Sequence, residues 1–183
     1  MPALEMKSNS ALKSVLFLFL SLLFAAVLLI GAKLALSGSL ASFSGVAPTN
    51  LGIQSGQLAP CPSTPNCVSS FAKDSEHKIE PLTYTSTPEV AFNDLKSVIK
   101  NLERTKIITK TDNYLDAEFT SQLLGFVDDV EFYLDKAENV IHVRSASRLG
   151  ESDLGVNRQR IEKMRSLLNQ AQTQPASTSN YKL

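Results

Sequence analysis

The sequence predicts an α+β protein, with a four-stranded antiparallel meander, helices packed on one face of the sheet, and one N-terminal transmembrane helix. Three observations predict this fold. An uncharged apolar run lies near the N-terminus, four segments of alternating polarity follow one another between residues 105 and 147, and a helical apolar pattern lies on each side of them. The length of 183 residues suits one compact domain with appendages. The 18 lysine and arginine residues balance the 18 aspartate and glutamate residues, so the formal net charge is zero and nucleic acid is not expected as a partner.

Residues 14–36 are expected to form the transmembrane anchor. Within them the run SVLFLFLSLLFAAVLLIGA, residues 14–32, carries no charge. A helix of these 19 residues is roughly 28 Å long, which matches the hydrocarbon core of a bilayer. A cleaved secretory signal is the alternative, because a small-x-small sequence follows at residues 39–41. Lysines within residues 1–13 favour a cytoplasmic N-terminus, so the rest of the chain is expected to be exported, into the periplasm or an equivalent space.

The chain after the apolar run divides into three parts by composition. Residues 37–60 are rich in Gly and Ser, carry no charge, and predict a flexible linker. Residues 61–170 contain the periodic patterns and predict the globular domain. Residues 171–183 are polar and predict a disordered tail.

Each element of the globular domain has its own local signal. A helix is expected to begin after Thr87, which caps it, with Pro88 in the first turn and Glu89 at the positive end of the helix dipole. Apolar residues then recur every three or four positions as far as Leu102. Four strands are expected at about 105–110, 114–121, 126–134 and 139–147, separated by Asn, Asp and Gly turn residues. A second helix is expected from about 156 to 170.

Cys61 and Cys67 are the two cysteines of the chain, and in an exported domain they predict one disulfide. Their spacing is not the Cys-x-x-Cys of redox-active pairs. A zinc site is a further alternative, for which His77 and Asp74 are the nearby candidate ligands.

Alternation along the strands sorts their side chains onto two faces. Asp129 and Arg144 are expected on an outer, water-exposed face, where acids and bases pair across strands. Asp128 shares the apolar face, where a carboxylate needs a partner. Arg158 and Arg160 are the candidate partners, so Asp128 either pins the second helix to the sheet or serves a ligand site.

The segment RSASRLGESDLGVNRQR, residues 144–160, combines four arginines with small residues. Arginines beside a helix N-terminus can hold a phosphate or carboxylate with two hydrogen bonds. Asp153 or Asn157 can cap the second helix. The segment has neither the Gly-x-x-x-x-Gly-Lys pattern of a phosphate loop nor the Gly-x-Ser-x-Gly pattern of a nucleophile elbow.

Four blocks together resemble one known family: CPSTPNCVSS (61–70), HKIEP (77–81), GFVDDVEF (125–132) and RSASRLGESDLGVNRQRIE (144–162). They are similar to the domain of unknown function 1499 family, whose members occur in bacteria and in photosynthetic lineages, and the similarity covers about residues 61–168. The family carries no established activity, so the resemblance implies common ancestry and a common site but no reaction. The residues of this chain that fall within its blocks are Cys61, Cys67, Asp128, Asp129, Arg144, Ser145, Ser147, Arg148, Asp153, Asn157 and Arg160.

These observations favour a membrane-anchored envelope protein that acts as a binding or structural module. The exported domain is expected to bind an anionic small molecule, a lipid headgroup or a partner protein, with the acidic, serine and arginine residues of those blocks as ligand contacts. The alternative is a hydrolase that uses Asp128 or Asp129 with Arg144 and Ser147. Alternation argues against it, because Asp128 and Arg144 are expected on opposite faces of the sheet. No catalytic residue, metal ion or cofactor is expected from the sequence.

Overall fold

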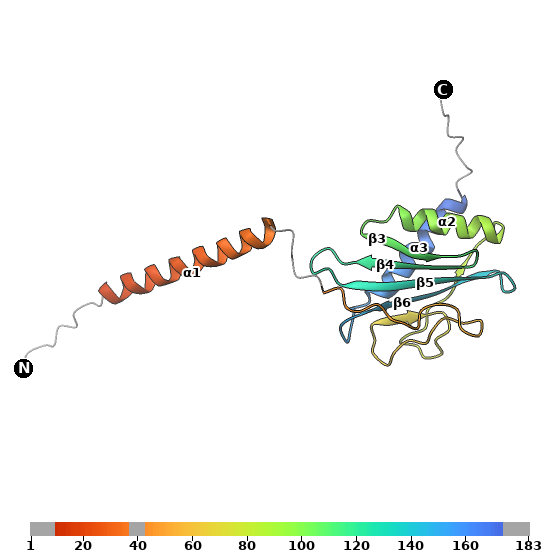
Figure 1. Cartoon of the computed structure of the whole chain (residues 1–183), viewed down its shortest axis with the longest axis horizontal. Helices are drawn as coiled ribbons and strands as arrows, with labels where there is room; N and C mark the ends of the chain where they lie inside the picture. Colours follow the sequence, from red (N-terminus) through yellow and green to blue (C-terminus); the bar gives the residue numbers. More distant parts are fainter. Residues whose placement is uncertain (1–9, 37–42, 174–183) are drawn as a thin grey trace, which may run out of the picture. The chain divides into compact units, whose positions relative to one another are not determined.

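A computed structural model describes residues 10–36 and 43–173 of the chain (Figure 1). Helix α1, Ser10–Leu36, forms a unit by itself, and the second compact unit begins after it. Residues Lys13–Ala32 of α1 are long and apolar enough to cross a membrane and are not buried against the rest of the protein. The chain therefore carries one N-terminal apolar helix, as expected, whose properties suit a membrane span or a signal sequence.

The predicted meander is present. The strands are β3 (Thr105–Lys110), β4 (Tyr114–Thr120), β5 (Val127–Asp135) and β6 (Val140–Ser147), and neighbouring strands pair antiparallel in that order. The sheet is larger than predicted, because two short strands, β1 (Cys67–Ser69) and β2 (Leu82–Thr83), both pair with the free edge of β6. The sequence did not reveal them, since two or three residues are too few to show a period.

Helices α2 (Pro88–Lys100) and α3 (Val156–Thr173) supply the apolar side chains that cover one face of the sheet. Helix α2 begins as expected, because the Thr87 hydroxyl accepts the Val90 N–H. The two helices contribute these side chains to the core: Phe92, Leu95, Ile99, Ile161, Met164 and Leu168. They pack against these side chains of the strands: Leu115, Ala117, Val130, Phe132, Ile141 and Val143. We call this side of the sheet the core face.

The opposite face is also covered, and the expectation that it is open to water is wrong. Residues 43–60, which we call the strap, contact it: the Gly52 N–H donates to Glu131 Oε1 at 2.7 Å. The Phe71 ring stacks on His142, with 4.1 Å between the ring centroids. At the end of β6 the strap lies so close that a Cβ added to Gly45 would be 2.8 Å from the Arg148 Cβ.

The strap is part of the linker predicted over residues 37–60, and its contacts with the sheet differ from that expectation. A segment without charged side chains can still be ordered where its backbone N–H groups meet buried carboxylates. Residues 171–173 of the predicted tail belong to helix α3, which extends to Thr173. Residues 37–42 of the predicted linker and 174–183 of the predicted tail lie outside the described residues.

Cys61 and Cys67 form the predicted disulfide, which uses both sulfur atoms and leaves none to bind zinc. We expect the double variant C61S/C67S to lose about 2–2.5 kcal/mol of unfolding free energy, because opening so short a loop frees the unfolded chain. Urea unfolding of both proteins in non-ionic detergent measures this difference, and a reductant should lower the wild type to the variant. Equal stability of oxidised wild type and variant would contradict the prediction.

Candidate functional site

The nine site residues predicted from the sequence lie on two faces of the sheet. On the core face and at the start of α3 is the helix-side cluster: Asp128, Ser145, Ser147, Asp153, Asn157 and Arg160. On the opposite face is the strap-side cluster, in which Asp129, Arg144 and Arg148 meet three acids that were not proposed as site residues: Asp116, Glu118 and Glu131. The split follows from strand geometry, because successive side chains point to opposite faces.

Asn157 lies at the centre of the helix-side cluster and is fully buried. Its Nδ2 donates to Ser147 Oγ at 3.0 Å and to the Asn66 carbonyl oxygen at 2.9 Å. Its Oδ1 accepts hydrogen bonds from Ser145 Oγ, at 2.6 Å, and from the Arg160 guanidinium. All hydrogen-bonding positions of this amide are occupied, so it ties α3 to β6 and to the loop before β1.

Asp128 is paired with Arg160, one of its two predicted partners. Arg158, the other candidate, instead donates to the backbone carbonyl oxygens of Lys78 and Glu76. Both arginines thus attach α3 to other parts of the domain. A buried carboxylate with a charged partner needs no external cation.

Asp153 is the residue that caps α3. Its carboxylate accepts the Asn157 N–H at 2.7 Å and the Gly155 N–H at 2.9 Å. The turn needs the left-handed region at Leu154 and Gly155, with φ values of 54° and 82°. Gly155 adopts this conformation without strain because it has no side chain.

The two residues of the Asp128–Arg160 pair line different cavities. Arg160 lines the first, of about 500 Å³, which we call the basic cavity. Asp128 lines the second, of about 250 Å³, which we call the apolar cavity. The basic cavity is lined by Asn101, Leu102, Glu103, Arg104, Phe119, Val156, Gln159, Arg160 and Lys163. The apolar cavity is lined mainly by Phe126, Leu149, Leu154 and Val156, with polar groups that include Asp128, Ser147 and Asp153.

In the strap-side cluster Glu131 is 0% exposed, and each of its oxygens has a donor. Oε1 accepts from Gly52 N–H and from Tyr114 Oη at 2.8 Å, while Oε2 accepts from Arg144 Nη1 at 3.1 Å. Burial, followed by the charge of Glu131, raises the pKa of the Tyr114 hydroxyl far above its ordinary value, so this group remains a donor.

Arg148 binds two carboxylates of the same cluster. It donates to both oxygens of Asp129, at 2.8 and 2.6 Å, and to Glu118 Oε1 at 2.6 Å. These hydrogen bonds to Asp129 and Glu118, against an opposing effect of burial, raise the pKa of the guanidinium further above its already high value. The cluster thus holds four acids and two arginines, and three of the acids contact an arginine.

Asp116 is the acid left without a direct arginine contact. It stands opposite Glu131 in the β4–β5 register, it is 4% exposed, and its Oδ1 has no hydrogen-bond partner among the described residues. Burial, then the neighbouring charges of Asp129, Glu131 and Glu118, raise its pKa from 3.8 to about 6. The face is therefore rich in negative charge, and its arginines already bind carboxylates.

This arrangement does not support a hydrolase that combines Asp128 with Arg144. Asp128 faces α3 and pairs with Arg160, whereas Arg144 lies on the strap face and pairs with Glu131. Ser147 Oγ accepts a hydrogen bond from the Asn157 amide, which is no base. The residues of the alternative hypothesis do not converge on one reacting position.

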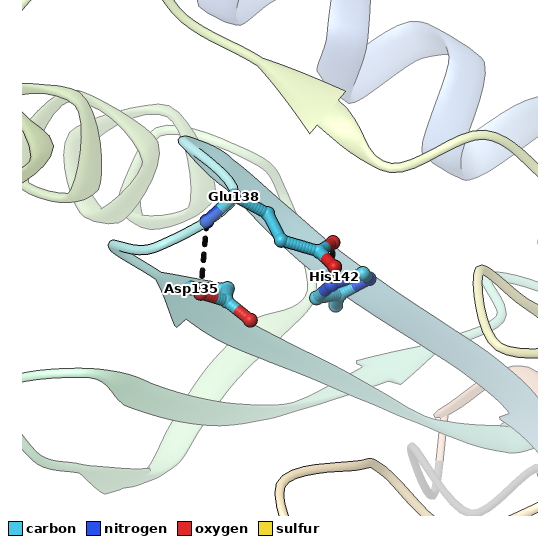
Figure 2. A group of neighbouring side chains, drawn as sticks. All are labelled: Asp135, Glu138 and His142. Carbon is cyan, nitrogen blue, oxygen red and sulfur yellow. Dashed lines mark hydrogen bonds and ion pairs between the residues drawn. The ribbon is translucent and has the colours of Figure 1, made fainter.

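Asp135, Glu138 and His142 form a third group of polar side chains, at the β5–β6 turn (Figure 2). Their candidate ligand atoms lie within 4.8 Å of one another. Asp135 Oδ1 accepts the backbone N–H of Ala137 and Glu138, and the two ring nitrogens of His142 face Ser70 Oγ and Glu138 Oε2. Turn formation and ion pairing account for these three side chains, so we assign no metal ion to them.

The sequence reasoning missed Arg104 and Lys163, which line the basic cavity with Arg160. Arg104 ends the connection from α2 to β3, in the left-handed region with φ 55°, and Lys163 lies on an exposed position of α3. Neither stands in a cluster along the chain, so no sequence signal distinguished them from other surface cations.

Comparison with known protein families identifies one family. Residues 57–168, more than half of the chain, match the family described as Protein of unknown function (DUF1499). This confirms the resemblance seen in the four sequence blocks. No curated protein matches the chain.

Proposed function

Since the chain belongs to the DUF1499 family and the description of that family names no activity, we propose a function from the geometry: an exported, membrane-anchored domain that binds an amphiphilic anion in the basic cavity. The observation that carries the proposal is the lining of this cavity, in which three cations stand beside an apolar wall. The N-terminal apolar helix and the disulfide support the exported, anchored part of the proposal.

The charge of the cavity favours an anion. Lys163 has no carboxylate within 4.0 Å among the residues that the structure describes. Among the described residues, the Arg104 guanidinium pairs only with its neighbour Glu103, and an exposed pair of this kind contributes little to stability. An incoming phosphate or carboxylate can therefore replace Glu103 as the partner of Arg104 at small cost.

The apolar wall favours a ligand that also has a hydrocarbon part. Leu102, Phe119 and Val156 line the cavity beside the cations. The Arg160 guanidinium lies over the Phe119 ring, 5.0 Å from its centroid, while it remains bonded to Asp128. Arg160, held by Asp128, thus forms a fixed wall of the cavity, and Arg104 and Lys163 supply the cations that are free to move onto a ligand.

This site differs from the arginine-centred site expected from the sequence. Arg144 and Arg148 are occupied by Glu131, Asp129 and Glu118 on the strap face. Only Arg160 among the proposed ligand residues lines the basic cavity. An anion binds more favourably to cations that are not already paired with buried carboxylates. Arg104 and Lys163 meet this condition among the described residues, which supports the basic cavity as the binding site.

The test is titration of the full-length protein in dodecyl maltoside with hexyl phosphate, followed by amide shifts of α3. We expect Lys163→Gln and Arg104→Gly each to weaken binding by roughly three- to tenfold, which corresponds to about 0.7–1.4 kcal/mol. Glycine at position 104 removes the cation and also suits the left-handed backbone found there, so stability should stay within about 1 kcal/mol of wild type.

Two matched ligands and one variant complete the experiment. Inorganic phosphate should bind more weakly than hexyl phosphate, and hexyl glucoside should not bind, because the cavity is expected to need both charge and hydrocarbon. Lys110→Gln removes an exposed lysine at the far end of β3 and should leave binding unchanged. Equal affinity of wild type and both cavity variants for hexyl phosphate would refute the proposed function.

A further inference from the structure

We propose that one end of the domain rests on a lipid bilayer through a rim of exposed apolar side chains. The rim consists of Phe43, Leu123, Leu124, Leu149, Leu154 and Val156. Leu154 is 89% exposed and Leu123 is 72% exposed, values that are unusual for leucines of a folded domain. The inference rests on one part of the proposed function, namely that α1 is retained as an anchor.

Contacts and a shared cavity connect the members of the rim other than Leu123, which is the chain neighbour of Leu124. The Phe43 ring stacks on Phe126, with 5.4 Å between the centroids, and the Phe43 N–H donates to the Leu124 carbonyl oxygen. Phe126 in turn lines the apolar cavity together with Leu149, Leu154 and Val156. Three segments therefore meet here: the start of the strap, the β4–β5 connection and the loop between β6 and α3. Figure 1 shows these three segments at one end of the sheet.

A continuous apolar surface on a soluble domain marks an interaction site. Chain connectivity favours a bilayer as the partner. Residues 37–42 are all that separates α1 from Phe43, and six residues span at most about 20 Å even when fully extended. If α1 crosses the membrane, Phe43 cannot leave the neighbourhood of the lipid surface, and Phe43 is itself a member of the rim.

The charges near the rim indicate whether its binding to a bilayer needs anionic lipids. Glu151 and Asp153 lie in the same loop as Leu149 and Leu154, so this part of the rim gains no attraction from anionic headgroups. The apolar side chains are therefore expected to enter the interface of a neutral phosphatidylcholine bilayer. Leu149, Leu154 and Val156 of the rim also line the apolar cavity, so an acyl chain that entered this cavity would contact side chains of the rim.

The chain contains no tryptophan, so the fluorescence of a single introduced tryptophan reports on the surroundings of that position. The experiment places Leu123→Trp and Leu154→Trp in the full-length protein, reconstituted in phosphatidylcholine vesicles whose acyl chains carry bromine at a shallow or a deep position. The matched control is Ala137→Trp, an exposed position in the β5–β6 turn at the opposite end of the sheet.

We expect blue-shifted emission and at least twofold quenching by the shallow bromines at positions 123 and 154, with less quenching by the deep bromines. The Ala137→Trp emission should match that of tryptophan in water. Emission from both rim variants that matches the control would overturn the proposal. Blue-shifted emission without bromine quenching would also overturn it, because protein rather than lipid would then cover the rim.

Failure of this proposal and failure of the proposed function have different signatures. Hexyl phosphate binding in detergent depends on Arg104 and Lys163 and needs no bilayer contact of the rim. If the protein binds hexyl phosphate but the tryptophan at position 154 is not quenched, only the proposed contact of the rim with the bilayer is refuted. A protein with a quenched rim and no response to hexyl phosphate refutes the anion site alone.

Discussion

Arg148→Ala is expected to lower the free energy of unfolding by about 3–5 kcal/mol, the largest loss among the variants considered for this protein. Arg148 is the only arginine that contacts Asp129 among the described residues, and Asp129 is 1% exposed. Its removal leaves Asp129 and Glu118 without their cation on a face that already carries two further buried acids. A buried carboxylate that loses its partner keeps the full cost of leaving water.

Burial rather than proximity produces this effect, and the chain offers a matched control. Lys136 and Glu89 are also 2.6 Å apart, but both side chains are mostly exposed. Lys136→Ala should therefore leave the unfolding curve unchanged within error. The measurement is urea denaturation of the full-length proteins in dodecyl maltoside, followed by circular dichroism.

A double-mutant cycle separates the ion pair from other consequences of losing a long side chain. Asp129→Asn removes the charge that Arg148 neutralises, so Arg148→Ala should cost less in that background, with a coupling of about 1–3 kcal/mol. Additive effects would mean that Arg148 acts mainly through the packing of its stem beneath the strap. A wild-type curve for Arg148→Ala alone would show that this arginine is available to a ligand, contrary to our assignment.

Most of the sheet and both helices of the domain could be predicted from the sequence, because their signals are local and periodic. The Thr87 cap, the alternation of β4 and β5, and the apolar positions of α3 each lie within one element. The partner of Asp128 could be narrowed to Arg158 or Arg160 for a similar reason: a carboxylate on an apolar face demands a cation from whatever covers that face.

The strap could not be predicted, because its composition is that of a flexible linker. Its order comes from a partner almost eighty positions away, at the contact between the Gly52 N–H and Glu131. Alternation correctly placed Asp129 and Arg144 on one face where acids and bases pair across strands. Alternation cannot show, however, whether a charged face is exposed to water or covered. The acids of the strap face therefore looked like ordinary surface residues.

The basic cavity could not be predicted for a related reason. Arg104 directly precedes β3 and Lys163 lies within α3, and the two meet through the packing of α2 against α3. The segment from 144 to 160, in contrast, was predicted to contain ligand contacts because its arginines are close in sequence. Three of those four arginines are held by carboxylates, and the fourth, Arg158, by backbone carbonyls.

Asp116→Asn is expected to make the protein more stable, because it removes a buried carboxylate whose Oδ1 has no hydrogen-bond partner among the described residues. The free energy of unfolding at pH 7.5 should rise by about 1–3 kcal/mol. The pKa of Asp116 is raised from 3.8 to about 6 by burial and by three neighbouring acids. At pH 7.5 the folded protein must hold this group charged and without a partner for Oδ1. An amide has no charge to bury, and its Nδ2 can donate to the neighbouring carboxylates.

The pH dependence gives the sharper test, because its sign follows from the direction of the pKa shift. Between pH 3.8 and about 6 the folded state holds a proton on Asp116 that the unfolded state has lost, so stability falls as pH rises through this window and changes no further above it. The difference between Asp116→Asn and wild type should therefore be near zero below pH 4, grow up to about pH 6, and then stay constant. Asp112→Asn, in the exposed β3–β4 turn, should run parallel to wild type throughout. A difference for Asp116→Asn that does not vary between pH 4 and pH 7 would contradict the raised pKa of this carboxylate.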